Sequence, residues 1–405
     1  MSNKKKILIC DHYLEVGGAE RALISLLNSI DTRKYHVDLF LNQHTGEFLK
    51  YIPQDINLLP EISTYSSLLR PIKQIFKEGH IGIALRRILG LRCHHKYHNS
   101  LEENLKRNDE SVYQFVSKLT TPALPSLAFL GEYDLAISFR APHNIVLNKV
   151  RARKKICWIH TDYSSIHINR ELELPIWSGY SNIISISDEV TQSFLQIFPE
   201  LKSKIILVEN ILSAKTIREF ANEELPVEMD CKSNELALLS IGRFSIPKKF
   251  QDIPIICRKL LDCGLKIKWF IIGYGNQEET RKISDAIKSN NVEDKVIILG
   301  KKANPYPYIK RCDWYIQPSL YEGKSVAVRE AQLLGKPVII TEYPTAHSQI
   351  TDGLDGIIVP LPIDMCIRGI YNAITNEKLK TQIISHLQSK DLSNVTEVEK
   401  IYTLI

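Results

Sequence analysis

Short apolar runs alternate with helical patterns along the whole chain. Five runs in the first half predict strands, at residues 6–10, 36–41, 134–139, 155–159 and 182–186. Five more in the second half do the same, at residues 236–244, 266–275, 295–300, 313–319 and 336–342. Strands that alternate with helices form parallel sheets with crossover helices, so the pattern predicts an α/β fold.

The alternation pauses once, near the middle of the chain. Residues 213–234 are polar and acid-rich and contain a proline, and 405 residues are too many for one ordinary core. We therefore expect two Rossmann-like domains, residues 1–212 and 213–387, with a C-terminal helix at about 388–405 packing back on the first. Parallel sheets bind ligands at the carboxyl ends of their strands, so the ligand is expected in a cleft between the domains.

Composition narrows the class of protein. A chain that is 44% hydrophobic and 24% charged is typical of a globular protein. Its eight cysteines form no C-x-x-C pair, which favours reduced thiols in the cytoplasm. The N-terminal apolar run lasts four residues, and no run approaches the 18 or more that a membrane span needs, so the sequence predicts neither a signal peptide nor a transmembrane helix.

Much of the positive charge lies in one segment, residues 65–98, within a chain of net charge +6. There a single acid, Glu78, accompanies seven basic residues: Arg70, Lys73, Lys77, Arg86, Arg87, Arg92 and Lys96. Apolar and cationic residues mixed at helical spacing are typical of helices on an anionic membrane surface, and equally of a solvated helix face. Nucleic acid is not expected as a partner, because the segment has few aromatic residues and no recognised motif.

Two glycines, Gly17 and Gly18, follow the first predicted strand in HYLEVGGAERAL. Glycines at a strand-to-helix turn allow backbone N–H groups to approach a phosphate closely. A nicotinamide dinucleotide fits poorly, because a third glycine is missing and the second strand ends in Asn42-Gln43 instead of an acid. The loop alone leaves two alternatives, a different phosphate ligand and a tight turn without a ligand.

The stretch PSLYEGKSVAVREAQLLGKPVIITEYPT carries two glutamates, Glu322 and Glu330. Its pattern places the first in a loop after a strand and the second on a helix. The N–H groups at the start of this helix, around Lys324, Ser325 and Val326, favour an anion such as a diphosphate. A carboxylate accepts two hydroxyl groups at once, as a ribose or a hexose presents them. The stretch therefore predicts a site for a phosphate and a sugar.

Several stretches in a fixed order resemble one family: GGAER in the first loop, WIHTD at 158–162, ISISDEV at 184–190, SIGRFSIPKKFQD at 240–252, FIIGYG at 270–275 and EGKSVAVREA. Together they resemble the retaining glycosyltransferases of family 4, or group 1, which have the GT-B fold. EGKSVAVREA and TEYPT look most like enzymes that build bacterial capsules, lipopolysaccharide and other surface polysaccharides. The resemblance implies an acceptor-side domain followed by a domain that binds a nucleotide sugar.

The resemblance also implies roles in binding the donor. Glu330 would hold the ribose of the nucleotide, and Glu322 would hold the donor sugar. The backbone would meet sugar and phosphate at Lys324, Ser325 and Val326.

Two cations are expected at the diphosphate, Arg243 and Lys249. Lys248 competes with Lys249 for this role. Lys249 is preferred because residues 250–252 then take the place of the family's Gly-x-Asp, although Phe replaces the glycine.

In the first domain, the resemblance places His160 beside the transferred sugar, at the end of a strand. Gly17 and Gly18 would meet the distal phosphate of the donor and the incoming acceptor. Two departures from the family are visible: Asn210-Ile211-Leu212 lacks the usual glycine of the domain crossing, and Gln349 replaces a glutamate.

The resemblance implies a retaining glycosyltransferase with a UDP-sugar as the favoured donor and a glycan or lipid-linked sugar as the acceptor. Cations at the phosphate stabilise the charge that develops on the leaving group. Because no D-x-D cluster is present to hold a divalent cation, neither a metal nor another cofactor is expected. The protein would lie at the inner face of the cell membrane. The alternatives are a sugar-nucleotide epimerase on the same fold and an inactive subunit that binds a nucleotide sugar.

Overall fold

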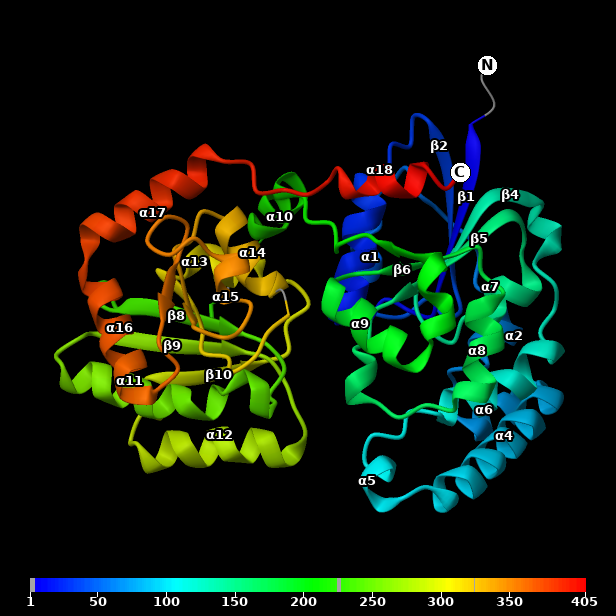
Figure 1. Cartoon of the computed structure of the whole chain (residues 1–405), viewed down its shortest axis with the longest axis horizontal. Coiled ribbons are helices and arrows are strands. Elements are labelled where there is room, and N and C mark those ends of the chain that lie inside the picture. The colour runs from blue at the N-terminus through cyan, green and yellow to red at the C-terminus, as the bar shows by residue number, and fades with distance from the viewer. Residues whose placement is uncertain (1–3, 224–226, 324) are drawn as a thin grey trace. The chain divides into compact units, whose positions relative to one another are not determined.

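The computed structural model describes residues 4–223, 227–323 and 325–405. The chain divides into two compact units, one built from Met1–Ile211 with Val395–Ile405 and the other from Leu212–Asn394. Each unit has its own parallel sheet, and both sheets are visible in Figure 1.

The first sheet has the strand order β3-β2-β1-β4-β5-β6-β7, and all its neighbouring strands are parallel. Its strands are β1 Lys5–Asp11, β2 Tyr35–Leu41, β3 Asn57–Leu58, β4 Glu132–Ser138, β5 Arg151–Ile159, β6 Asn182–Ser185 and β7 Ile205–Leu207. The central strands are apolar on both faces because helices cover both; Ile7, Leu8 and Ile9 are completely buried. The strand order reverses between β1 and β4, so the carboxyl ends of these two strands mark the ligand-binding edge.

The helices of the first unit complete the crossovers between its strands. They are α1 Gly18–Ser29, α7 Asn144–Lys149, α8 Arg170–Ser178 and α9 Asp188–Ile197. The long connection from β3 to β4 adds α2 Ser63–Ser66, α3 Ile72–Lys77, α4 Ile81–Ser100, α5 Glu103–Lys106 and α6 Val112–Thr120. Helix α4 packs closely on α6 at Gly90. Glycine permits this approach, because a Cβ atom there would lie only 2.8 Å from the Cα atom of Val116.

The second sheet has the order β10-β9-β8-β11-β12-β13, again all parallel. Its strands are β8 Leu236–Ile241, β9 Ile267–Ile272, β10 Val296–Gly300, β11 Trp314–Gln317, β12 Val338–Thr341 and β13 Ile357–Val359. Its helices are α10 Ala214–Ala221, α11 Ile253–Asp262, α12 Gln277–Ser289, α13 Tyr306–Arg311, α14 Val326–Leu333, α15 Ala346–Gln349, α16 Ile363–Thr375 and α17 Glu377–Ser389. Separate apolar clusters cover the two faces, and the order reverses between β8 and β11.

The C-terminal segment returns to the first unit through α18 Glu397–Tyr402, drawn in red beside α1 in Figure 1. The ring of Tyr402 stacks on Tyr35 with centroids 4.5 Å apart, and its hydroxyl accepts the Asp31 N–H at 2.7 Å. The returning segment begins at Val395, later than the expected 388, because residues 377–389 form α17 in the second unit.

Candidate functional site

The carboxyl ends of β8 and β11 lie side by side at the reversal point of the second sheet. The loop after β8 contains residues 242–252, and the loop after β11 leads into α14. In open α/β sheets ligands bind at this place, outside the ends of the strands. Both predicted glutamates and all the predicted cations of the second unit lie on these two loops or on α14.

Glu322 is held by three donors at the end of β11. Its side chain is 6% exposed, and Oε1 accepts hydrogen bonds from Gln317 Nε2 at 3.0 Å and Ser319 Oγ at 2.7 Å. The other oxygen, Oε2, pairs with the ammonium group of Lys248 from the loop after β8. A carboxylate with this many partners keeps one orientation, as a group that positions a ligand requires.

Glu330 lies on α14 and is 1% exposed, with Oε1 accepting a hydrogen bond from the Tyr306 hydroxyl at 2.8 Å. Burial raises the pKa of Tyr315, and the charges of Glu322 and Glu330 raise it further. The charges of both glutamates, eight positions apart in sequence, therefore act on one buried phenol.

The two adjacent lysines differ sharply in conformation. Lys249 has φ +52° and ψ +30°, the left-handed region that favours glycine, and its Nζ atom pairs with Asp252 at 2.8 Å. Phe250 is buried in a right-handed turn, where no glycine is needed. Lys248, in contrast, pairs with Glu322, so the two lysines have different partners. Which of them contacts a phosphate stays a prediction.

Arg243 directly follows the turn after β8 and is exposed. Its guanidinium carbon lies 5.9 Å from the ring centroid of Tyr274, and Lys301 Nζ lies 5.0 Å from the same ring. The GYG stretch, in the loop after β9, packs closely on the loop of Arg243. Glycine permits this contact, because a Cβ atom at Gly273 would lie only 1.9 Å from the Gly242 carbonyl oxygen. Among the described residues, Arg243 and Lys301 are therefore exposed cations at this edge that form no ion pair with a carboxylate.

The start of α14 differs from the expectation of free N–H groups. The N–H of Ser325 donates to Gln349 Oε1 at 3.1 Å, and Gln349 Nε2 donates to the Ser325 carbonyl at 2.6 Å. This amide is engaged within the protein, so the prediction that it points freely at a ligand is wrong for Ser325. Val326 is the first residue of α14, and Lys324 lies outside the described residues.

His160 follows β5 at the edge of the first sheet. The centroid of its ring lies 4.5 Å from that of Phe139, and its ring is stacked on Trp158 with centroids 6.4 Å apart. Burial, with a smaller contribution from the charge of Arg140, lowers the pKa of His160 to about 3. Its Nε2 atom is buried and has no hydrogen-bond partner among the described residues. The ring is therefore neutral at pH 7, and its buried Nε2 atom is unpaired among the described residues.

Arg140, which sequence reasoning missed, occupies the centre of this edge. Its Nε donates to Asp11 Oδ1, its Nη1 to Glu20 Oε1 and its Nη2 to the Tyr13 carbonyl, each at 2.6 Å. The Glu20 carboxylate lies against Gly17 at the start of α1. A Cβ atom at Gly17 would be only 2.2 Å from Glu20 Oε2. Gly18 has open space around it. A carboxylate therefore already lies where a phosphate was expected to approach Gly17.

The second unit matches a known family. Residues 222–389 fit the family model described as glycosyl transferases group 1. The matched residues include Arg243, Lys248, Glu322 and Glu330.

A curated relative is the N-acetylgalactosamine-N,N'-diacetylbacillosaminyl-diphospho-undecaprenol 4-alpha-N-acetylgalactosaminyltransferase of Campylobacter jejuni, 21% identical over 61% of this chain and 64% of that enzyme. The chain spans less than two thirds of the length of the curated relatives it matches, 63% and 64% in two cases.

Two solved structures share the fold of the whole chain. Anabaena HepE in complex with UDP and glucose has a TM-score of 0.61 at 16% identity, with 99% of both chains covered. WaaG, a glycosyltransferase involved in lipopolysaccharide biosynthesis, has a TM-score of 0.60 at 13% identity, with 98% of this chain and 99% of that chain covered. The two parallel-sheet units of this chain therefore have the GT-B fold of these structures.

Arg140 could have been found from the sequence by analogy with Arg243. Arg140 follows β4 in DLAISFR as Arg243 follows β8 in LALLSIGR, and both strands lie at the reversal point of their sheets. The partners Gln317, Ser319 and Tyr306 carry no comparable signal, because their roles depend on how separate strands and helices pack.

We expect two histidines of the first unit to stay neutral down to low pH. Burial lowers the pKa of His143, which is 3% exposed, to about 3, as it does for His160. An unfolded chain binds protons at these groups below about pH 6.5, while the folded chain does not, so folding stability is lost as pH falls, by up to about 1.4 kcal/mol per pH unit for each histidine.

The check is NMR of protein with labelled histidine rings, assigned with His143→Gln and His160→Gln variants. The two ring signals should stay constant from pH 8 to pH 5. A midpoint near 6.5 for either would contradict the burial described here.

Proposed function

We propose that the protein transfers a sugar from a nucleoside-diphosphate sugar to a glycan or a lipid-linked sugar in the synthesis of a surface polysaccharide. UDP-sugars are the favoured donors, transfer retains the anomeric configuration, and no metal ion takes part. The observation that carries the proposal is the placement of Glu322, Glu330 and Lys248 at the β8–β11 edge of the unit that matches the group 1 glycosyltransferase model.

In this proposal each charged group of the second unit has one task. Glu330 accepts the two ribose hydroxyls, Glu322 binds hydroxyls of the donor sugar, and the Val326 backbone lies at the sugar and phosphate. Lys248 and Arg243 bind the diphosphate. Breaking the bond between sugar and phosphate leaves negative charge on the leaving group, and fixed cations there lower the barrier.

The first unit contributes the acceptor side. His160, neutral at pH 7, places its unpartnered Nε2 at the transferred sugar, where it accepts or donates one hydrogen bond without carrying charge. The acceptor hydroxyl attacks from the side of the leaving phosphate, and that phosphate takes the acceptor's proton. In the loop of Gly17 and Gly18, the open space at Gly18 leaves room for the acceptor.

The comparisons support a donor with UDP and an acceptor on a lipid carrier. HepE was solved with UDP and glucose, and the Campylobacter relative is named for a sugar carried on diphospho-undecaprenol. Both properties belong to those proteins. For this chain they make UDP-sugars and lipid-linked sugars the first substrates to test.

We expect one class of nucleotide sugar to stabilise the protein. In a thermal-shift screen of UDP-, GDP-, ADP- and CMP-sugars, ligand at 100 times its Kd adds about 2.7 kcal/mol to the free energy of unfolding. Glu330→Gln should weaken binding at least about tenfold, because hydrogen bonds to a charged acceptor contribute about 1.5–3 kcal/mol. Glu377→Gln, an exposed change on α17, is the matched control.

Incubating the protein with the donor found in the screen, with and without an acceptor, separates the alternatives. An epimerase would convert the bound donor without an acceptor, and an inactive subunit would bind it and convert nothing. No shift with any nucleotide sugar would overturn the proposed donor site.

We expect Lys248 to matter more than Lys249 for the chemical step. Lys248→Met should lower kcat/KM by ~10²–10³, the usual cost of losing one group that stabilises transition-state charge. Lys249→Met should cost less than about tenfold, because that ammonium group is paired with Asp252. Release of nucleoside diphosphate from the donor found in the screen measures both. Equal losses in the two variants would contradict the assignment.

We also propose that helices α3 and α4 lie on an anionic membrane. Arg70 and Arg87 are engaged inside the unit, Arg70 with Glu61 and Glu78 and Arg87 with the carbonyls of Ser67 and Arg70. The other basic side chains are exposed, and apolar ones are exposed beside them: Leu69, Phe76, Ile81, Leu85, Leu89 and Leu91.

Ile81, Leu85 and Leu89 form one stripe along α4, four residues apart and each at least half exposed. Such a stripe beside cations favours a helix lying in the membrane surface. Within the described parts of the chain, no helix has both the length and the apolar character needed to cross a bilayer.

We expect the protein to co-sediment with phosphatidylglycerol vesicles at low salt and to stay in the supernatant with phosphatidylcholine vesicles. Each cation at an anionic surface is worth about 1 kcal/mol, so reversing three, Arg86, Arg92 and Lys96→Glu, should weaken binding on the order of 100-fold or more. A matched variant reverses three exposed lysines of the second unit, Lys259, Lys288 and Lys390→Glu. Equal binding by both variants would refute the surface.

A further inference from the structure

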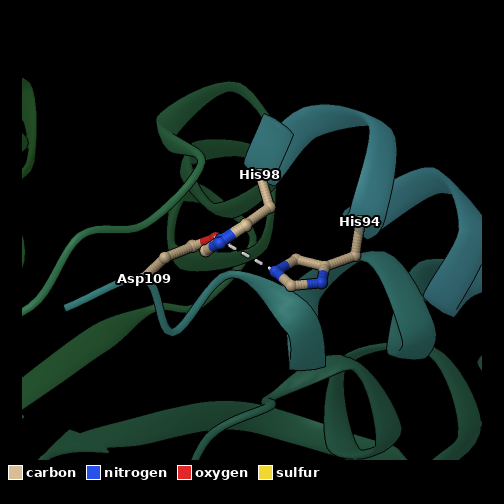
Figure 2. Close-up of side chains that lie close together, drawn as sticks. All are labelled: His94, His98 and Asp109. Carbon is tan, nitrogen blue, oxygen red and sulfur yellow. Dashed lines mark hydrogen bonds and ion pairs between the residues drawn. The ribbon is translucent and has the colours of Figure 1, made fainter. Parts of the chain in front are cut away.

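Three potential metal ligands gather in the first unit, on the segment that joins β3 to β4. His94 and His98 lie one turn apart on α4, and Asp109 lies on the segment between α5 and α6 (Figure 2). No residue of this cluster has a part in the proposed transfer reaction.

The three side chains point toward one another. Asp109 Oδ2 lies 3.0 Å from His94 Nε2 and 2.7 Å from His98 Nδ1, and all three atoms lie within 4.8 Å of one another. A tetrahedral zinc ion with bonds of 2.0–2.1 Å places its ligand atoms about 3.3 Å apart. The two distances from Asp109 differ from this value by tenths of an ångström, and the two imidazole nitrogens lie no more than 4.8 Å apart.

The surroundings fix the carboxylate and leave the imidazoles accessible. The side chain of Asp109 is completely buried, and its other oxygen, Oδ1, accepts the Ser111 N–H at 3.0 Å, which turns Oδ2 toward the histidines. The histidine side chains are 18% and 32% exposed, so an ion can reach them from solvent.

We propose that His94, His98 and Asp109 bind Zn²⁺, with water as the fourth ligand. Two imidazoles and one carboxylate are a ligand set of zinc, whereas Mg²⁺ and Ca²⁺ prefer oxygen ligands alone. The ion would link the last turns of α4 to the segment that leads into α6. The cluster lies outside both sheet edges, and the proposal does not depend on the transfer activity.

Zinc content and zinc affinity test the site in the untagged full-length chain. Protein purified without chelator should hold one Zn²⁺ per chain by mass spectrometry. EDTA should lower its Tm, and added ZnCl₂ should restore it. His98→Ala and Asp109→Asn should each weaken binding at least about tenfold in a titration against a chromogenic chelator.

His95→Ala is the matched control, since His95 lies on the same helix, is exposed and contacts Asn99 instead of the cluster. It should bind Zn²⁺ as the wild-type protein does. The proposal is overturned if the wild-type chain neither holds nor responds to Zn²⁺, or if His98→Ala binds it as tightly as His95→Ala does. The wild-type result decides the question even where a cluster variant fails to fold.

Discussion

The ion pair between Lys248 and Glu322 joins the two loops on which the donor site depends. A carboxylate that is 6% exposed is costly to bury unless it is paired and hydrogen-bonded, and Glu322 has both kinds of partner. The same loops are also joined through the backbone, where the Leu320 N–H donates to the Pro247 carbonyl at 2.7 Å. A phosphate arriving at Lys248 would share this cation with Glu322, so donor binding and loop geometry are coupled at one atom.

The two sheet edges use arginine in opposite ways. Arg140 is enclosed by Asp11, Glu20 and the Tyr13 carbonyl, so its charge is already balanced within the protein. Arg243 is exposed and its described contact is a tyrosine ring, so its charge is available to an anion. The electrostatics therefore favour phosphates at the second unit and uncharged groups, such as sugar hydroxyls, at the first. This argues that the loop of Gly17 serves the acceptor more than the diphosphate.

Sequence patterns predicted the fold well and the site in part. The strands missed by the hydrophobic pattern are β3, β7 and β13, which have only two or three residues and so carry no readable alternation. Glu322 and Glu330 were found because their spacing lies within one strand-loop-helix unit. The pairing of Lys248 with Glu322 and the engagement of Ser325 by Gln349 join separate loops and helices, which spacing does not reveal. The cluster on α4 had a local signal, His94 and His98 four residues apart, but its third member comes from beyond the helix.

The exposed apolar stripe of helix α4 lies on a helix whose opposite face is fixed by contacts within the first unit. One face carries Leu85 and Leu89 into solvent, which folding alone does not favour. The opposite face is fixed by the close approach of Gly90 to α6 and by the two carbonyls that Arg87 binds, and its C-terminal turns are fixed by Asp109. A helix held at this many points keeps its stripe in place without a partner. A membrane bound there, as proposed, would meet a surface that is already formed, and the entropy cost of ordering it would not be incurred on binding.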